Sequence, residues 1–115
     1  MSRRPTRVLA TFPNPRPGRE YVIRHECGEY TAVCPITGQA DFYVARIKYS
    51  PKKLCLESKS LKIYLSRFRN EGVFAEALAV RIKDDVAAAL KLHRSAVTVT
   101  LTQKPRGGIR ITATA

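Results

Sequence analysis

The chain has 115 residues, of which 44% are hydrophobic and 26% charged, a composition typical of one globular domain that buries its own core. No apolar run approaches the roughly 18 residues of a membrane-spanning helix, and the basic start is not followed by the apolar stretch of a signal peptide. Three cysteines without CxxC spacing indicate neither a disulfide framework nor a zinc knuckle. We therefore expect a protein of the reducing cytoplasm without a membrane segment.

The net charge of +12 is high for a chain of this length and raises the question of an anionic partner. Residues 46–69 hold eight basic residues against a single acid, Glu57. Such a stretch attracts polyanions, which include nucleic acid, an acidic membrane and a phosphorylated cofactor. Charge alone does not choose among them, and a solvated basic face that keeps the protein soluble fits equally well.

The first half of the chain predicts an irregular arm and two strands. Residues 1–18 contain four of the seven prolines and little periodicity, so they predict the arm. Residues 19–27 and 41–49 alternate between two faces, which predicts strands joined by a loop at 28–39 that carries Cys34. The predicted apolar faces are Tyr21, Ile23, His25 and Cys27 in the first strand, and Tyr43, Ala45, Ile47 and Tyr49 in the second.

The second half predicts two helices and two further strands. Residues 60–68 and 71–92 show helical spacing, and residues 96–102 and 109–114 alternate again around a tight turn at 104–108. The apolar positions of the helices are Leu61, Tyr64, Leu65 and Phe68 in the first, and Phe74, Leu78, Ile82, Val86 and Leu90 in the second.

This order of elements predicts an α+β fold, with an antiparallel four-stranded sheet and two helices on one of its faces. Residues 19–115 would form it as a single domain. The late strands carry neither an inward charge nor a mid-strand proline, the usual defences of an exposed sheet edge. Pairing of open edges between copies would cover them, so we expect an oligomer.

The loop segment CPITGQAD (residues 34–41) offers a thiol and a carboxylate that a turn could bring together. A Cys34 thiolate can attack an electrophilic carbon, and Asp41 can handle the proton if burial raises its pKa. On the residues alone, a buried structural cysteine and a capping aspartate are the commoner roles. Cys27 and Cys55 lie in apolar contexts and are predicted to be structural.

The segment ESKSLKIY (residues 57–64) places two lysines at the start of a predicted helix. Lys59 and Lys62 are one turn apart and share a face. A helix N-terminus favours phosphate, and two ammonium groups add to that preference. A solvated lysine pair is the alternative.

Together the two segments resemble the 7-cyano-7-deazaguanine reductase family, QueF, over a match from Tyr30 to Ile111. The resemblance implies the tunnelling fold, in which subunits assemble into a barrel of stacked rings, a decamer, with active sites between neighbours. It further implies NADPH-dependent reduction of the nitrile of 7-cyano-7-deazaguanine to the aminomethyl product through a cysteine thioimide. That reaction belongs to the biosynthesis of queuosine, a tRNA modification.

The resemblance also implies residue roles. Cys34 would be the nucleophile and Asp41 its partner in proton transfer, and no metal is implied. Glu76 would accept hydrogen bonds from the guanine-like edge of the substrate. Phe74 could stack on the deazapurine ring, although its fourfold periodicity favours the core. The remaining predicted contacts are Glu57 and Ser58 to the substrate, and Lys59, Ser60, Lys62, Arg106 and Gly107 to NADPH.

Two positions depart from the resembling family. Many members carry a histidine immediately before the glutamate, where this chain has Ala75, and His25 and His93 lie in other segments. The proton route is therefore in question. Ala40 stands where a proline is common.

Three other functions fit parts of the sequence. Related archaeal proteins form an amidine on a deazaguanine within tRNA; the basic stretch suits that substrate, but the lysine segment favours NADPH. Direct contact with tRNA is not expected. An RNA-binding module lacks its aromatic platform, because the chain has no tryptophan and no RNP-like string. A zinc-dependent cyclohydrolase would need more ligands than residues 25–27 offer.

Overall fold

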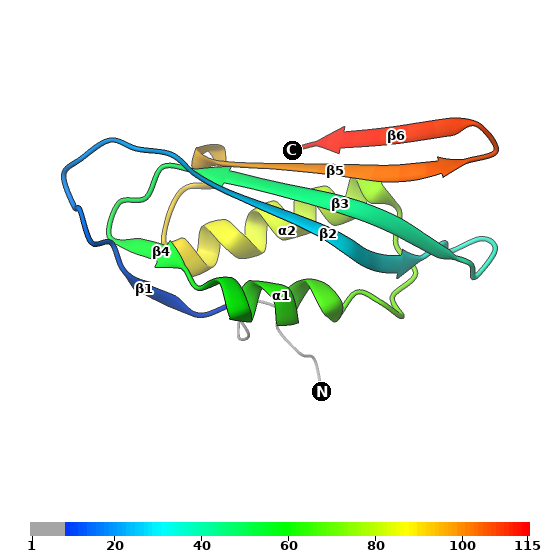
Figure 1. The fold of residues 1–115 in the computed structure, drawn as a ribbon, viewed down its shortest axis with the longest axis horizontal. Helices are drawn as coiled ribbons and strands as arrows, with labels where there is room; N and C mark the ends of the chain where they lie inside the picture. The colour runs from blue at the N-terminus through cyan, green and yellow to red at the C-terminus, as the bar shows by residue number, and fades with distance from the viewer. Residues whose placement is uncertain (1–8) are drawn as a thin grey trace.

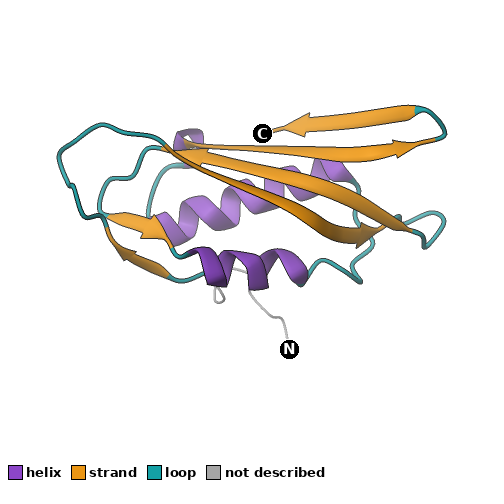
Figure 2. Cartoon of the chain, in the orientation of Figure 1, coloured by secondary structure: helices purple, strands orange, loops and turns teal. Residues whose placement is uncertain are grey.

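The computed structural model describes residues 9–115, apart from the side chains of Glu29 and Arg106. Two helices cover one face of a four-stranded antiparallel sheet of order β2-β3-β5-β6 (Figures 1 and 2). The elements are β1 (Thr11–Pro13), β2 (Ile23–Val33), β3 (Ala40–Tyr49), β4 (Leu54–Leu56), α1 (Ser58–Ser66), α2 (Ala75–Leu90), a short 3-10 helix η2 (Arg94–Ala96), β5 (Val97–Arg106) and β6 (Ile109–Thr114). The predicted α+β arrangement is confirmed, and assembly into a barrel stays a prediction. Within the described residues, no helix is long and apolar enough to cross a membrane.

One core lies between the sheet and the helices. Alternate side chains of a strand point to the same face, so β3 and β5 each contribute every second residue. The buried apolar positions of these two strands are Tyr43, Ala45, Ile47, Tyr49, Val97, Val99 and Leu101. From the helices come Leu61, Tyr64, Leu65, Leu78, Ile82, Val86 and Leu90. These positions confirm the predicted apolar faces of β3, α1 and most of α2.

Strand β2 is longer than the sequence predicts and ends beside the candidate nucleophile. It begins at Ile23 and continues to Val33, so the predicted loop at 28–39 shrinks to residues 34–39. The register with β3 shifts between Cys27 and Tyr30, which indicates a β-bulge. An extra residue there breaks the alternation, and this is why the pattern did not reveal the second half of the strand.

Both helices differ from the prediction at their ends. Helix α1 begins at Ser58, two residues early, because the Glu57 carboxylate accepts hydrogen bonds from the first backbone N–H groups. Helix α2 ends at Leu90, where Lys91 takes a left-handed φ of 58°. Residues 71–73 were predicted as helix but are extended, since they pair with the end of β2.

The proline-rich arm contains a strand that the sequence did not predict. Thr11–Pro13 (β1) pairs antiparallel with β4, and Leu9 is buried. The backbone N–H of Glu57 donates to the carbonyl of Ala10 over 2.9 Å. Strands of three residues are too short to show a period of two, so neither β1 nor β4 could be recognised. The arm thus fixes the start of α1.

The late hairpin turns through two glycines. Gly107 and Gly108 have φ values of 63° and 83°, a left-handed conformation that glycine adopts without strain. β5 runs four residues beyond its predicted end and includes Pro105, where the register with β6 is irregular. The expectation of a late strand free of proline was therefore wrong for β5. This strand is internal, however, and the open edges belong to β2 and β6.

Candidate active site

Cys34 opens a tight loop between two strands of the sheet. Its N–H donates to the carbonyl of Gln39 over 2.8 Å, and its own carbonyl accepts from the N–H of Gly38 over 2.9 Å. Gly38 has a φ of 74°, and the Thr37 hydroxyl oxygen accepts a bond from the Gln39 N–H. These bonds close the loop on itself and bring Asp41, the second residue of β3, back toward the sulfur.

The surroundings of Cys34 favour its thiolate. Hydrogen bonds from the Thr37 hydroxyl and from the N–H groups of Thr37 and Ile36 lower the pKa of Cys34, against smaller opposing effects of burial and the Asp41 charge. The thiolate is the nucleophilic form of cysteine. Burial instead raises the pKa of Cys27, and Cys55 is buried, as expected for structural cysteines.

The start of α2 is fastened beside the Cys34 loop. The N–H of Val33 donates to the carbonyl of Glu71 over 3.0 Å, and the Val33 carbonyl accepts from the N–H of Val73 over 3.1 Å. Each bond ties the last residue of β2 to the extended segment before the helix. The first turn of α2 therefore lies close to the candidate nucleophile.

A cavity of about 410 Å³ lies at this junction. Its lining residues are Cys34, Asp41, Phe74, Gln103, Gly107 and Ile111. Asp41 is only 4% exposed, so its carboxyl is largely withdrawn from water at the wall of the cavity. The predicted thiol and carboxylate thus share one cavity.

Phe74 corrects one expectation of the sequence. Its periodicity favoured a place in the core, but it precedes α2 and is 51% exposed. The helical period does not apply to Phe74 because it is the N-cap residue, which precedes the first helical residue. Its ring lies where a planar ligand beside Cys34 could stack on it.

Three further predicted site residues belong to segments near this cavity: Gly107, Glu76 and Arg106. Gly107 lines the cavity from the tip of the late hairpin. Glu76 is exposed in the first turn of α2, and its negative charge contributes to raising the pKa of Tyr43 on β3. The side chain of Arg106 lies outside the described residues.

Sequence reasoning missed Gln103, Ile111 and Tyr43. A signal existed for Gln103, because it follows Val97, Val99 and Leu101 on the inward face of β5 and breaks their apolar series. A polar side chain at an inward position is an informative exception. Ile111 faces the same cavity from β6.

The lysine segment forms a second region at the start of α1. The Glu57 carboxylate caps the helix by accepting hydrogen bonds from the N–H groups of Lys59 and Ser60, and these bonds lower the pKa of Glu57. The Ser60 hydroxyl accepts from the N–H of Ala10 over 2.8 Å and donates to the Glu57 carbonyl over 2.8 Å. Both polar groups are therefore engaged within the fold, while Lys59 and Lys62 remain exposed.

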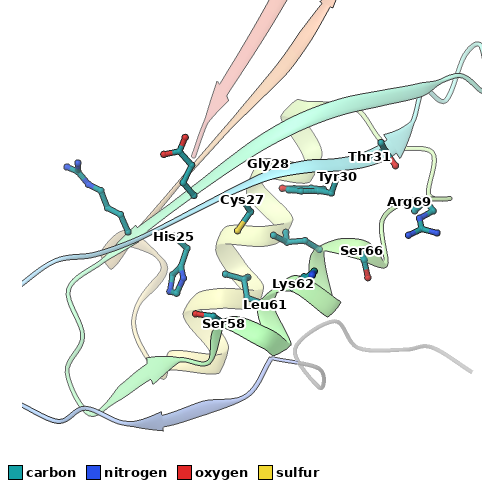
Figure 3. A pocket seen from close by; sticks show the side chains of 13 residues that line it. His25, Cys27, Gly28, Tyr30, Thr31, Ser58, Leu61, Lys62, Ser66 and Arg69 are labelled. Carbon is teal, nitrogen blue, oxygen red and sulfur yellow. The ribbon is translucent and has the colours of Figure 1, made fainter.

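A larger cavity of about 720 Å³ separates α1 from β2 (Figure 3). Its lining includes the cations Arg24, Lys62 and Arg69, one carboxylate, that of Glu26, and the hydroxyls of Ser58 and Ser66. On the opposite wall, His25 and Cys27 point from β2 toward the helices (Figure 3). The Nε2 atom of His25 and the hydroxyl of Tyr30 are buried and have no hydrogen-bond partner within the described part of the chain. The cavity thus combines positive charge with unused polar atoms.

The two cavities have no lining residue in common among those described. The structure therefore brings Cys34, Asp41, Phe74 and Gly107 together, but places the predicted lysine pair elsewhere in the chain. Across residues 9–115, the described side chains form no group of three or more His, Cys, Asp or Glu suited to a metal ion.

Comparison with known proteins extends these observations. The family described as QueF-like protein matches residues 40–115. The NADPH-dependent 7-cyano-7-deazaguanine reductase of Anaeromyxobacter sp. (strain K) is 57% identical over 90 residues, 78% of this chain and 74% of that protein. The reductase of the same name from Alkalilimnicola ehrlichii is 43% identical over 115 residues, 100% of this chain and 88% of that protein.

Among solved structures, the archaeosine synthase QueF-Like in its apo form aligns with a TM-score of 0.73. The alignment covers 82% of this chain and 90% of that one at 24% sequence identity, so the likeness concerns the fold. The sequence matches carry the assignment further, because they span most of the chain at 43–57% identity. This protein therefore belongs to the QueF family, that of the NADPH-dependent 7-cyano-7-deazaguanine reductases.

Proposed function

We propose that this protein reduces the nitrile of 7-cyano-7-deazaguanine to an aminomethyl group at the expense of NADPH, in the biosynthesis of queuosine in the cytoplasm. The observation that carries the proposal is the cavity shared by Cys34 and Asp41, with a thiol whose pKa is lowered and a buried carboxyl. The curated relatives bear the name of this reductase.

The first chemical step joins Cys34 to the substrate. The sulfur attacks the nitrile carbon, a C–S bond forms, and one π bond of the nitrile becomes a lone pair on nitrogen. Asp41 takes the proton that leaves the thiol and delivers it to this nitrogen, so the net change is addition of S–H across the triple bond. The product is a thioimide on Cys34, formed without an outside reagent.

Reduction of the thioimide needs a hydride donor. When bound, NADPH supplies hydride to the thioimide carbon; two transfers with two protons give the aminomethyl product and return the thiol. The donor set of the α1 region fits such a cofactor, because Lys62 lines a cavity with further cations and hydroxyls, and Lys59 is an exposed cation on the same helix. Its volume of about 720 Å³ also suits a large ligand.

Recognition of the deazapurine falls to groups around the Cys34 cavity. Phe74 presents an exposed ring for stacking, and Glu76 presents a carboxylate from the adjacent turn. A carboxylate matches an N–H and amino pair and would reject a ring that lacks them. Glu57 and Ser58 stay candidates for substrate contact from the start of α1.

Assembly would unite the two regions. Lys62 and Cys34 line different cavities of one chain, yet hydride transfer requires the ligands of these cavities to meet. A neighbouring copy could bring them together through the open edges β2 and β6, where Ile109 of β6 is 67% exposed. We therefore propose a closed ring of copies, two rings stacked as a decamer, with shared sites.

The second candidate function is amidine formation on a deazaguanine within tRNA. It would use the same thioimide but add ammonia in place of hydride, and the net charge of +12 suits a nucleic acid. The lysine pair favours the reductase, because an amidine-forming enzyme needs no NADPH. Incubation with free 7-cyano-7-deazaguanine and either NADPH or ammonia decides between them. Thioimide absorbance followed by NADPH oxidation supports the reductase, and a thioimide that reacts with ammonia but not with NADPH contradicts it.

A further inference from the structure

Tyr43 is a buried tyrosine beneath the Cys34 cavity, and the proposed mechanism does not use it. It follows Asp41 by two residues on β3, so both side chains point to the same face of the sheet. Its partner across the sheet is Gln103, which lines the cavity. Tyr43 is 1% exposed, and its hydroxyl has no hydrogen-bond partner among the described residues.

The groups around this hydroxyl are acceptors or potential acceptors. After burial itself, the charges of Asp41, Cys34 and Glu76, in that order, raise the pKa of Tyr43 to about 12. From β2, the ring of Tyr30 lies with its centroid 6.4 Å from that of Tyr43. At neutral pH the Tyr43 hydroxyl therefore keeps its proton, and a hydrogen bond donated to one of these groups would stabilise it.

A buried donor without an acceptor is costly, which makes this hydroxyl informative. Leaving such a group unsatisfied lowers the stability of the folded protein. Hydrogen bonds of active sites are often long in the free enzyme and tighten in the substrate complex. Ala75, buried at the start of α2, contributes no polar side chain to this region. Among the neighbouring charges, Asp41 acts most strongly on Tyr43.

We propose that Tyr43 is a positioning residue of the active site, whose hydroxyl donates a hydrogen bond to the Asp41 carboxylate when the cyano-deazapurine enters the cavity. This inference rests on the proposed function and adds a residue to it. Because Tyr43 is buried, its hydroxyl would hold the Asp41 carboxyl in one orientation between the Cys34 sulfur and the nitrile nitrogen. It also stabilises the carboxylate that remains after the proton has left for nitrogen.

The test compares Tyr43→Phe with Tyr64→Phe, a change on α1 at a tyrosine that lines neither cavity. Each change removes the hydroxyl of a buried tyrosine and keeps the ring. The Tyr64 hydroxyl donates to Asp85 over 2.6 Å, whereas Tyr43 adjoins the Cys34 cavity. The measurement is the rate of thioimide absorbance in stopped flow without NADPH, at saturating 7-cyano-7-deazaguanine and across pH, with substrate affinity from titration. We expect Tyr43→Phe to slow thioimide formation roughly ten- to a hundredfold at unchanged affinity. Its pH profile should shift, and Tyr64→Phe should resemble the unmodified protein.

A double-mutant cycle with Asp41→Asn tests the route through the carboxylate. If Tyr43 acts through Asp41, its removal should have little further effect in the Asp41→Asn background. Equal rates and pH profiles for Tyr43→Phe and the unmodified protein would overturn the inference alone, as would fully additive effects in the cycle. No thioimide in the unmodified protein would overturn the proposed function and this inference with it.

Discussion

Gly72 packs against Pro35, and this contact joins the two segments that make the candidate site. A Cβ built on Gly72 would lie 3.6 Å from the Cα of Pro35, an ordinary van der Waals contact. Gly72 also bridges to Val33 at the end of β2. Through these contacts, the loop that presents Cys34 and the helix start that presents Glu76 keep a fixed relation.

The first prediction concerns the acidity of Cys34. Thr37→Val removes the hydroxyl that contributes most to lowering the pKa of Cys34, so that pKa should rise. Less thiolate is then present near neutral pH, and the alkylation rate by iodoacetamide should fall there and recover at higher pH. Thr31→Val, on the wall of the other cavity, is the control and should leave the profile in place. An unchanged profile in Thr37→Val would show that the hydroxyl does not act on the sulfur.

The second prediction concerns the cofactor. Replacing both Lys59 and Lys62 by alanine should weaken NADPH binding by about 2–6 kcal/mol, because two charge-assisted phosphate contacts are lost. Thioimide formation should persist, since it precedes hydride transfer. Titration of NADPH fluorescence measures the affinity, and Lys83→Ala, a change on α2, is the control. Unchanged affinity in the double variant would move the amidine-forming alternative ahead.

The third prediction separates the two carboxylates. Asp41→Asn keeps the shape of the side chain but cannot carry the proton, so it should slow thioimide formation more than it weakens substrate binding. Glu76→Ala leaves donors of the substrate unpaired, so affinity should fall by about 1–3 kcal/mol. Calorimetric titration and single-turnover rates on both variants measure this. A loss of affinity alone in Asp41→Asn, with a loss of rate alone in Glu76→Ala, would reverse the roles.

The fourth prediction concerns assembly. If neighbouring copies complete the site, activity should fall on dilution together with the oligomer, because binding equilibria shift with protein concentration. Light scattering and activity assays over the same dilution series measure both. A fully active monomer at micromolar concentration is incompatible with the closed ring and with a shared site.

The sequence predicted the regular parts of this fold better than its irregular parts. The alternation from Tyr43 to Tyr49 predicted β3, and the fourfold series from Leu78 to Leu90 predicted α2, because one face of each element is buried without interruption. The bulge after Cys27 hid the end of β2, since an extra residue breaks the period. Extended residues 71–73 pair with another strand, a non-local cause that no local pattern reveals.

The candidate site was predicted in the same uneven way. Motif spacing singled out Cys34 and Asp41, and the structure brings them to one cavity. Gln103 and Ile111 come from the late hairpin and join this cavity only through sheet register. Tyr43 was read as a core residue from its alternation. That reading describes its ring, but the position of its hydroxyl depends on three-dimensional packing.

Every later step of the proposed reaction depends on a covalent thioimide between Cys34 and the cyano-deazapurine. Intact-mass spectrometry after incubation with 7-cyano-7-deazaguanine, without NADPH, tests it most directly. We expect the mass of one substrate to be added to the unmodified protein and to Cys55→Ala, and no addition to Cys34→Ala. An adduct on Cys34→Ala, or none on the unmodified protein at saturating substrate, would exclude Cys34 as the nucleophile.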